Sequence, residues 1–132
     1  MLRHASIYDT LDRSDAEGLR VLIMRYWPRG VRRDRVDVWV KDAAPSRELL
    51  HAYTHGEIDA GEFERRYRAE MTDERPGVLQ HLHDLEHEHG TLTLLCRERI
   101  PPSEYCHRLT LVELLRGVRA RVSTRACQSN CQ

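Results

Sequence analysis

The chain has 132 residues, and its 21 basic and 21 acidic side chains give a formal net charge of zero. This length fits one domain with one core, and the charge balance gives no support to bulk attraction to nucleic acid or membranes. The longest uninterrupted apolar runs, such as VLIM and LTLL, are far too short to span a membrane.

No segment has the pattern of a signal peptide. We therefore expect a cytoplasmic protein, in which thiols stay reduced. The four cysteines are then interpreted as free thiols and not as a disulfide framework: Cys96, Cys106, Cys127 and Cys131.

Two strands are predicted in the first part of the chain. Residues 5–9 alternate and contain β-forming side chains. Residues 19–26, LRVLIMRY, are almost continuously apolar at their centre, which is typical of a strand buried on both faces in a parallel sheet. Pro28 and Gly30 end this strand. The segment VDVWVKDAAPS that follows is ambiguous between a strand and a helical turn.

The rest of the pattern predicts helices around one more strand. Capping residues, a proline near a helix start and a glycine past a helix end mark helices at 47–54, at about 60–72 and between Pro76 and Gly90. Residues 91–96 form a second buried strand, and a last helix covers about 104–117. This order predicts an α/β layered domain over residues 1–118, with a small, mostly parallel sheet. Residues 119–132 are expected to be a flexible tail.

Charged and polar residues follow the two buried strands. Arg25 and Arg29 come at the end of the first, and Cys96, Arg97 and Glu98 come at the end of the second. Because ligands in open α/β sheets bind beyond the carboxyl ends of the strands, we expect the two strand ends to form one site.

The first turn of the last helix adds Cys106, His107 and Arg108 to this site. A helix start presents unpaired N–H groups and the positive end of the helix dipole, so arginines beside it favour anion binding. We expect Arg29 and Arg108 to hold a phosphate or a carboxylate by forked hydrogen bonds, assisted by Arg25. The alternative is that each arginine pairs with a structural carboxylate.

The same residues offer groups for catalysis, although the sequence leaves open whether the protein is an enzyme. Glu98 or His107 is a candidate general acid or base. Cys106 is a candidate nucleophile, because a helix N-terminus lowers the pKa of a thiol. Burial in the core is the alternative for Cys106 and for Cys96, and we prefer it for both.

Metal and cofactor motifs are weak in this sequence. His83 and His87 lie one helical turn apart, a spacing that can chelate a metal, but local sequence fixes no third ligand. We prefer a solvated helix face for them, and a frayed tail for Cys127 and Cys131. No phosphate-binding glycine loop, dinucleotide fingerprint or zincin motif is present. We therefore assign no metal ligand and no cofactor from the sequence, and metal binding by the His-rich helix or the tail cysteines stays open.

Three hypotheses about function remain. The first is a domain that binds, and can turn over, a phosphorylated or otherwise anionic small molecule such as a nucleotide. The second is a nucleic-acid-associated module that uses the arginine-rich segments 25–35 and 116–125. The third is a structural partner protein whose aromatics form an interface. Tyr26, Trp27 and Trp39 fit base stacking or, as we prefer, core and subunit contacts. The oligomeric state stays open.

The chain resembles a known family over about residues 7–115. RVLIMRYWPRGV, DVWVKDAAPS, FERRY and LTLLC are similar to the YeaO-like branch of the domain-of-unknown-function family numbered 488. The cysteine, glutamate and CHR arrangement after the second buried strand is more typical of the family's other branch. The resemblance implies a fold type and motif positions but no activity. The motif residues would be Arg25, Trp27, Pro28, Arg29, Gly30, Cys96, Glu98, Cys106, His107 and Arg108.

Overall fold

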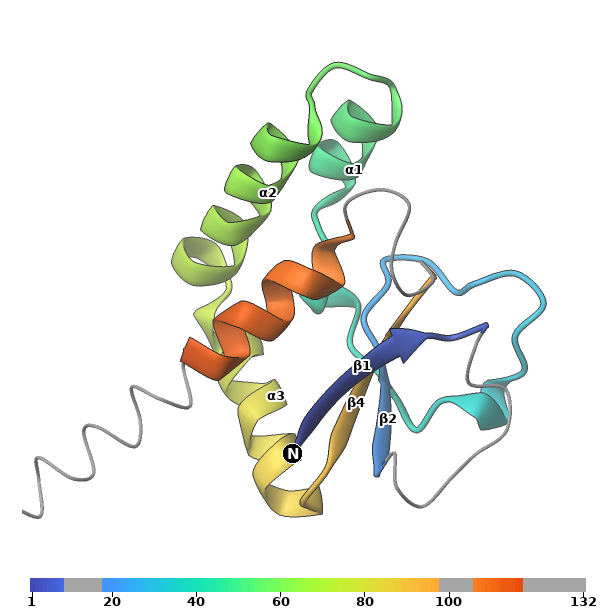
Figure 1. Ribbon diagram of the computed structural model, residues 1–132. Coiled ribbons are helices and arrows are strands. Elements are labelled where there is room, and N and C mark those ends of the chain that lie inside the picture. Colours follow the sequence, from blue (N-terminus) through green and yellow to red (C-terminus); the bar gives the residue numbers. More distant parts are fainter. Residues whose placement is uncertain (9–17, 98–105, 118–132) are drawn as a thin grey trace, which may run out of the picture.

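The protein contains a four-stranded sheet in which all neighbouring strands are parallel (Figure 1). The computed structural model describes residues 1–8, 18–97 and 106–117. The strand order is β1-β4-β2-β3, and the strands are β1 (Leu2–Ser6), β2 (Leu19–Leu22), β3 (Val38–Trp39) and β4 (Leu92–Cys96). The predicted α/β domain with a small parallel sheet is therefore confirmed.

The central strand β4 lies between β1 and β2. Its first residue, Leu92, is in register with Leu2 of β1 and with Leu19 of β2. All five residues of β4 are buried. This burial on both faces explains why β2 and β4 are almost continuously apolar in sequence.

Three α-helices lie between β3 and β4 in the chain, and their ends follow the predicted capping signals. α1 (Arg47–Thr54) begins after Ser46, whose side chain accepts from the N–H of Leu49. α2 (Ala60–Ala69) begins after Asp59, whose carboxylate accepts from the N–H of Glu62. α3 (Pro76–His89) ends at Gly90, which has a φ of 80°. A last helix covers residues 107–117.

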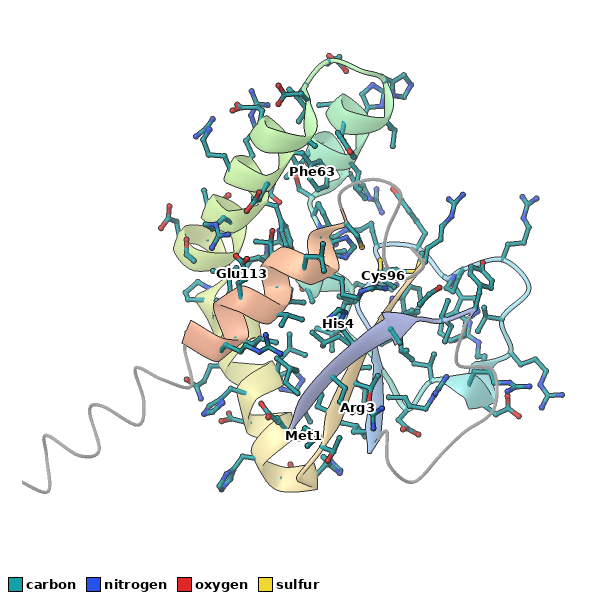
Figure 2. The ribbon with its side chains drawn as sticks, viewed as in Figure 1. Met1, Arg3, His4, Phe63, Cys96 and Glu113 are labelled. Carbon is teal, nitrogen blue, oxygen red and sulfur yellow. The ribbon has the colours of Figure 1, made fainter. Side chains whose placement is uncertain are left out.

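The two faces of the sheet are covered differently. The helices pack on one face, where Val21, Ile23 and Leu94 meet Phe63 of α2 and Leu111 of the last helix in one cluster (Figure 2). The loop between β2 and β3 crosses the other face, and its Trp27 and Val31 pack together with Trp39 of β3 around Leu22 and Leu95. Successive residues of β2 and β4 point to opposite faces, so both faces need apolar side chains.

Several predicted bounds differ from the structure. The first strand covers Leu2–Ser6 and not 5–9, because it pairs with β4 from Leu92 onward. β2 ends at Leu22, although the N–H of Ile23 still donates to Leu95. The predicted helix 60–72 is α-helical to Ala69 and continues as the π-helical turn η4 (Glu70–Glu74). There Glu70 accepts from the N–H of Ser46 at 2.9 Å, which ties this turn to the start of α1.

Short 3-10 turns complete the fold. The ambiguous segment before α1 contains β3 and then η3 (Lys41–Ala43), and η2 (Arg33–Arg35) precedes β3. The predicted start of the last helix and the predicted tail 119–132 lie outside the described residues. Within those residues, every helix is too short or too polar to cross a membrane.

Candidate functional site

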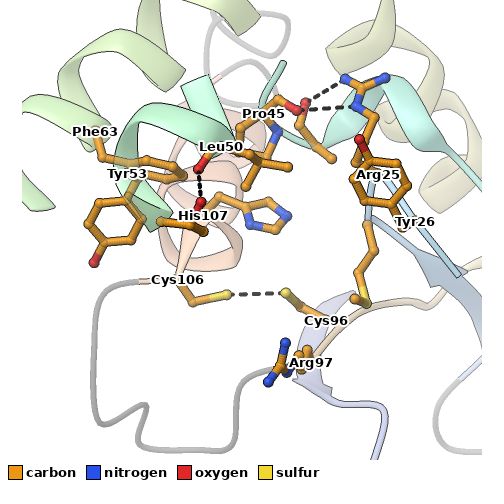
Figure 3. A pocket seen from close by; sticks show the side chains of 13 residues that line it. Arg25, Tyr26, Pro45, Leu50, Tyr53, Phe63, Cys96, Arg97, Cys106 and His107 are labelled. Carbon is orange, nitrogen blue, oxygen red and sulfur yellow. Dashed lines mark hydrogen bonds between the residues drawn. The ribbon is translucent and has the colours of Figure 1, made fainter. Parts of the chain in front are cut away.

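The ends of β2 and β4 lie side by side and open into a pocket of about 270 Å³. Its wall comes from the ends of these two strands, from α1 and α2, and from the start of the last helix (Figure 3). The side chains on this wall that carry polar or ionisable groups are Arg25, Tyr26, Tyr53, Thr54, Cys96, Arg97, Cys106 and His107. The structure therefore brings together the residues after both buried strands, which lie far apart in the sequence.

His107 joins the last helix to the end of β2. Its Nε2 lies 2.7 Å from the carbonyl oxygen of Ile23. A carbonyl oxygen only accepts, so Nε2 carries the proton and Nδ1 of the neutral ring carries a lone pair. The ring also packs edge-on against Tyr67, with centroids 5.4 Å apart. The predicted general acid or base thus has a fixed ring orientation in the pocket wall.

Cys96 and Cys106 form a close pair of buried thiols. Their sulfur atoms lie 3.2 Å apart, each residue is 3% exposed, and neither forms a disulfide. The hydrogen bond to Cys96 and burial both raise the pKa of the Cys106 thiol above its ordinary value. This direction is opposite to that of a thiol activated by a helix N-terminus.

Arg25 borders the pocket, but its guanidinium already has partners. Its Nε donates to the carbonyl of Pro45 and its Nη2 donates to that of Ala44, both at 3.2 Å. Its Nη1 lies 3.3 Å from a carboxylate oxygen of Asp42. These bonds fix the segment before α1 against the end of β2, so Arg25 shapes the pocket wall.

The two arginines expected to hold the anion do not border this pocket. Arg108 is fully buried, and Arg29 is exposed on the loop after β2, where its carbonyl accepts from the hydroxyl of Tyr8. Glu98 lies outside the described residues. Arg97 is exposed and does line the pocket. Sequence reasoning placed Arg97 at the end of this strand but assigned the anion contact to Arg29 and Arg108 instead.

The WPRG motif closes the second face of the sheet. Trp27 donates from Nε1 to the carbonyl of Val31, and Trp39 donates from Nε1 to that of Met24, both at 2.7 Å. The two indoles pack edge-on with centroids 5.3 Å apart. Pro28 is buried and Gly30 has a φ of 80°, in the region that favours glycine. Both tryptophans therefore pack against the core on this face of the sheet, which is the role that we preferred for them from the sequence.

One group of side chains in the described part of the chain has the spacing of metal ligands. The sulfur atoms of Cys96 and Cys106 and a ring nitrogen of His107 all lie within 4.8 Å of one another. Sequence reasoning placed these three residues in one site, but it interpreted the cysteines as core thiols or as a nucleophile and did not consider them as metal ligands. His83 and His87 instead border a different pocket, beside Met1 and Glu86.

One family model and several uncharacterized proteins are similar to this chain. A model described as "Active DUF488-N3 subclade" matches residues 3–118. Uncharacterized protein Mb3100c of Mycobacterium bovis is 45% identical over 74 residues, 54% of this chain and 61% of that protein. Uncharacterized protein Rv3073c of Mycobacterium tuberculosis has the same identity and coverage. Uncharacterized protein YeaO of Escherichia coli is 41% identical over 68 residues, 49% of this chain and 56% of that protein.

The matched segments span less than two thirds of each of these relatives. None of the solved structures matches the chain. The family model nevertheless covers almost all described residues, including the ends of β2 and β4 and the last helix. The chain therefore belongs to the DUF488 family, as a YeaO-like member of its DUF488-N3a subclade.

Proposed function

We propose that the pocket between the ends of β2 and β4 binds a small phosphorylated or otherwise anionic molecule, such as a nucleotide. The observation that carries this proposal is the combination of an apolar wall with an exposed arginine, Arg97, at the carboxyl ends of parallel strands. Ligands of open α/β folds bind at this edge of the sheet.

The apolar part of the wall suits a planar ring. Tyr53 of α1 and Phe63 of α2 contact each other, with ring centroids 4.4 Å apart, and Leu50 lies beside them in the same wall. Tyr26 is 58% exposed and also borders the pocket. Aromatic side chains stack on the flat face of any nucleic-acid base, whatever its identity. A base or another flat ring therefore has a surface to contact.

The charged part of the proposal rests on Arg97. No carboxylate within residues 1–8, 18–97 and 106–117 forms an ion pair with its guanidinium, and it also borders the neighbouring pocket on α1. A planar guanidinium binds phosphate or carboxylate oxygens through two parallel hydrogen bonds. We assign the anion contact to Arg97, in place of Arg29 and Arg108, and a supporting role to Arg25.

Turnover needs a group that moves a proton. His107 is the candidate within the pocket wall, and Glu98 stays a candidate by its place after β4. This proposal assumes a cytoplasmic location, because a reducing compartment keeps Cys96 and Cys106 as thiols.

The nucleic-acid alternative has less support from the contacts of segment 25–35. Arg25 pairs with Asp42, and Arg32 pairs with Asp34 at 2.7 Å. The guanidinium of Arg33 lies 5.0 Å from the centre of the Trp27 ring. These interactions neutralise or orient arginines that would otherwise be available for phosphates.

A thermal-shift screen at fixed salt tests the proposal. The ligands are phosphate, sulfate, common nucleotides and short DNA, and the proteins are the wild type, Arg97→Ala and the control Arg29→Ala. A ligand at a hundred times its dissociation constant adds about 2.7 kcal/mol to the free energy of unfolding. We expect one nucleotide or related metabolite to stabilise the wild type and Arg29→Ala but not Arg97→Ala.

Three results would count against this function. The first is that no anion changes the melting temperature. The second is that the ligand stabilises Arg97→Ala as much as the wild type. The third is that only DNA stabilises the protein and that this effect falls steeply with salt. The ligand that gives the expected pattern is then incubated with the protein, and product formation decides between binding and turnover.

A further inference from the structure

We propose that Cys96, Cys106 and His107 form a binding site for a transition metal ion of the zinc type, with one coordination position open to the pocket. Two thiols and an imidazole converge here from two separate elements. Cys96 is the last residue of β4, and the other two residues stand at the start of the last helix. The geometry, the orientation of the histidine and the burial of the group each support the assignment.

The distances suit a tetrahedral ion after a small adjustment. Zinc binds thiolate sulfur at about 2.3 Å and imidazole nitrogen at about 2.0–2.1 Å, so neighbouring ligand atoms lie roughly 3.6–3.8 Å apart. The two sulfurs here are 3.2 Å apart, and all three ligand atoms lie within 4.8 Å of one another. The thiols need to separate by roughly half an ångström, and ligand atoms as far apart as 4.8 Å need to approach by about 1 Å; side-chain rotation supplies both changes.

The histidine already has the hydrogen bond that metal-bound imidazoles use. A ligating histidine usually donates its other ring N–H to a carboxylate or a backbone carbonyl, which fixes the tautomer and the ring orientation. In this protein Nε2 of His107 donates to the carbonyl of Ile23 at 2.7 Å. The remaining nitrogen, Nδ1, is the ligand atom in the proposed site.

The group is also built into rigid structure. Cys96 and Cys106 are each 3% exposed and His107 is 9% exposed, so none is a solvated surface side chain. Two thiolates and a neutral imidazole balance the charge of a divalent ion without a further carboxylate.

The three ligands leave the fourth tetrahedral position to another molecule. All three residues border the 270 Å³ pocket (Figure 3). Three protein ligands plus a water or substrate is the arrangement of catalytic zinc sites, and two cysteines with one histidine is one of the known donor sets. Structural zinc sites, in contrast, have four protein ligands.

This inference does not depend on the proposed anion function. Metal binding is measured in the absence of nucleotides and phosphate, and anion binding is judged by the dependence on Arg97. If metal binding is not observed, the test of anion binding can still be interpreted, and the reverse also holds.

The test is a Co²⁺ titration of the full chain, first reduced and freed of metal. Tetrahedral Co²⁺ gives visible d–d absorption. A bound thiolate, which has lost its proton, adds near-ultraviolet charge-transfer bands from sulfur to the metal. We expect saturation at one ion per chain and displacement by Zn²⁺. The bands should disappear in Cys96→Ser and in Cys106→Ser, and they should weaken in His107→Ala.

The matched control is the double variant Cys127→Ser/Cys131→Ser, which removes the other two cysteines of the chain. It should keep the full spectrum. Bands that persist in Cys96→Ser, or that vanish only in the double variant, would overturn the assignment. So would the absence of tetrahedral bands under reducing conditions.

A second measurement avoids variants that fail to fold. Wild-type protein is alkylated with and without Zn²⁺, and the modified peptides are identified by mass. We expect Zn²⁺ to slow alkylation of Cys96 and Cys106 at least tenfold while Cys127 and Cys131 react as before. Equal rates at all four cysteines, or an intramolecular Cys96–Cys106 disulfide that forms with Zn²⁺ present, would contradict the site.

Discussion

His107 and Ile23 are joined by a 2.7 Å hydrogen bond between Nε2 and a backbone carbonyl, across 84 positions of sequence. This bond connects the start of the last helix to the end of β2. Ile23 also donates its N–H to Leu95 of β4, so a single residue holds three elements at the edge of the sheet. The pocket depends on this junction.

Removal of the His107 ring should destabilise the fold. The His107→Ala variant leaves the buried carbonyl of Ile23 without this donor and removes the edge-on contact with Tyr67. A buried polar group left unsatisfied costs about 1–3 kcal/mol in the free energy of unfolding. Urea denaturation measures the change, and His81→Ala on the exposed face of α3 is the control. Equal stability of the two variants would contradict this role.

The start of α1 depends on Ser46. Its side chain caps the helix by accepting from Leu49, and its hydroxyl and N–H both donate to the carboxylate of Glu70. We expect Ser46→Ala to lower the free energy of unfolding by about 1 kcal/mol or more, since loss of an N-cap alone costs about 0.5–2 kcal/mol. Arg47→Ala, an exposed neighbour, should change it by less than about 0.5 kcal/mol. A thermal melt that ranks them in the opposite order would refute the assignment.

Gly18 is required where the chain enters β2. Its φ is +63°, and a Cβ there would lie 2.2 Å from the carbonyl oxygen of Thr91. Gly18→Ala should therefore destabilise the protein by more than about 1 kcal/mol, because backbone strain adds to a steric overlap. Gly77 in α3 has open space around its Cβ position, so Gly77→Ala should be neutral or stabilising by up to about 1 kcal/mol. Comparable losses in both variants would show that the close approach to Thr91 is not the cause.

The stability of the protein should depend on pH through His4 of β1. Burial lowers the pKa of His4, and the positive charges of Arg108 and Arg116 lower it further. The unfolded chain binds a proton at His4 near pH 6.5 while the folded chain still does not, so stability falls as pH drops below about 6.5. His4→Gln should flatten this part of the stability curve. A curve as steep as that of the wild type would disprove the contribution.

Arg116 offers an independent check on the same group. Arg116→Ala removes one of the charges that lower the pKa of His4, so that pKa should rise toward its ordinary value. NMR titration of the His4 ring signals measures it directly. A pKa equal to that of the wild type would mean that burial and Arg108 account for the entire shift.

The order of elements could be predicted because each has a local signal. α1 and α3 begin and end where Ser46, Pro76 and Gly90 indicate, and the buried strands have continuous apolar cores. The extent of β1 could not be read locally, because pairing with β4 decides which residues are extended. The π-helical turn at Glu70 also depends on a distant partner, Ser46.

The position of the candidate pocket could be predicted from the sequence, but the side chains that line it could not. Residues after β2 and β4 do meet at one edge of the sheet, as parallel neighbours must. Which arginine faces the pocket depends on side-chain direction: Arg108 points into the core while its neighbour His107 lines the wall. Sequence spacing also gave no sign that the sulfurs of Cys96 and Cys106 approach to 3.2 Å, because that distance depends on the path of the chain between them.

The most direct test of the joined strand ends as a binding site is a ¹H–¹⁵N NMR titration of the full chain with adenosine 5′-monophosphate, with inorganic phosphate as a second probe. We expect shifts concentrated on the pocket wall, at Met24, Tyr53, Cys96, Arg97 and His107. The shifts should saturate and should be much smaller in Arg97→Ala. Shifts centred on segment 29–35, or no shifts with either probe, would contradict the proposed site.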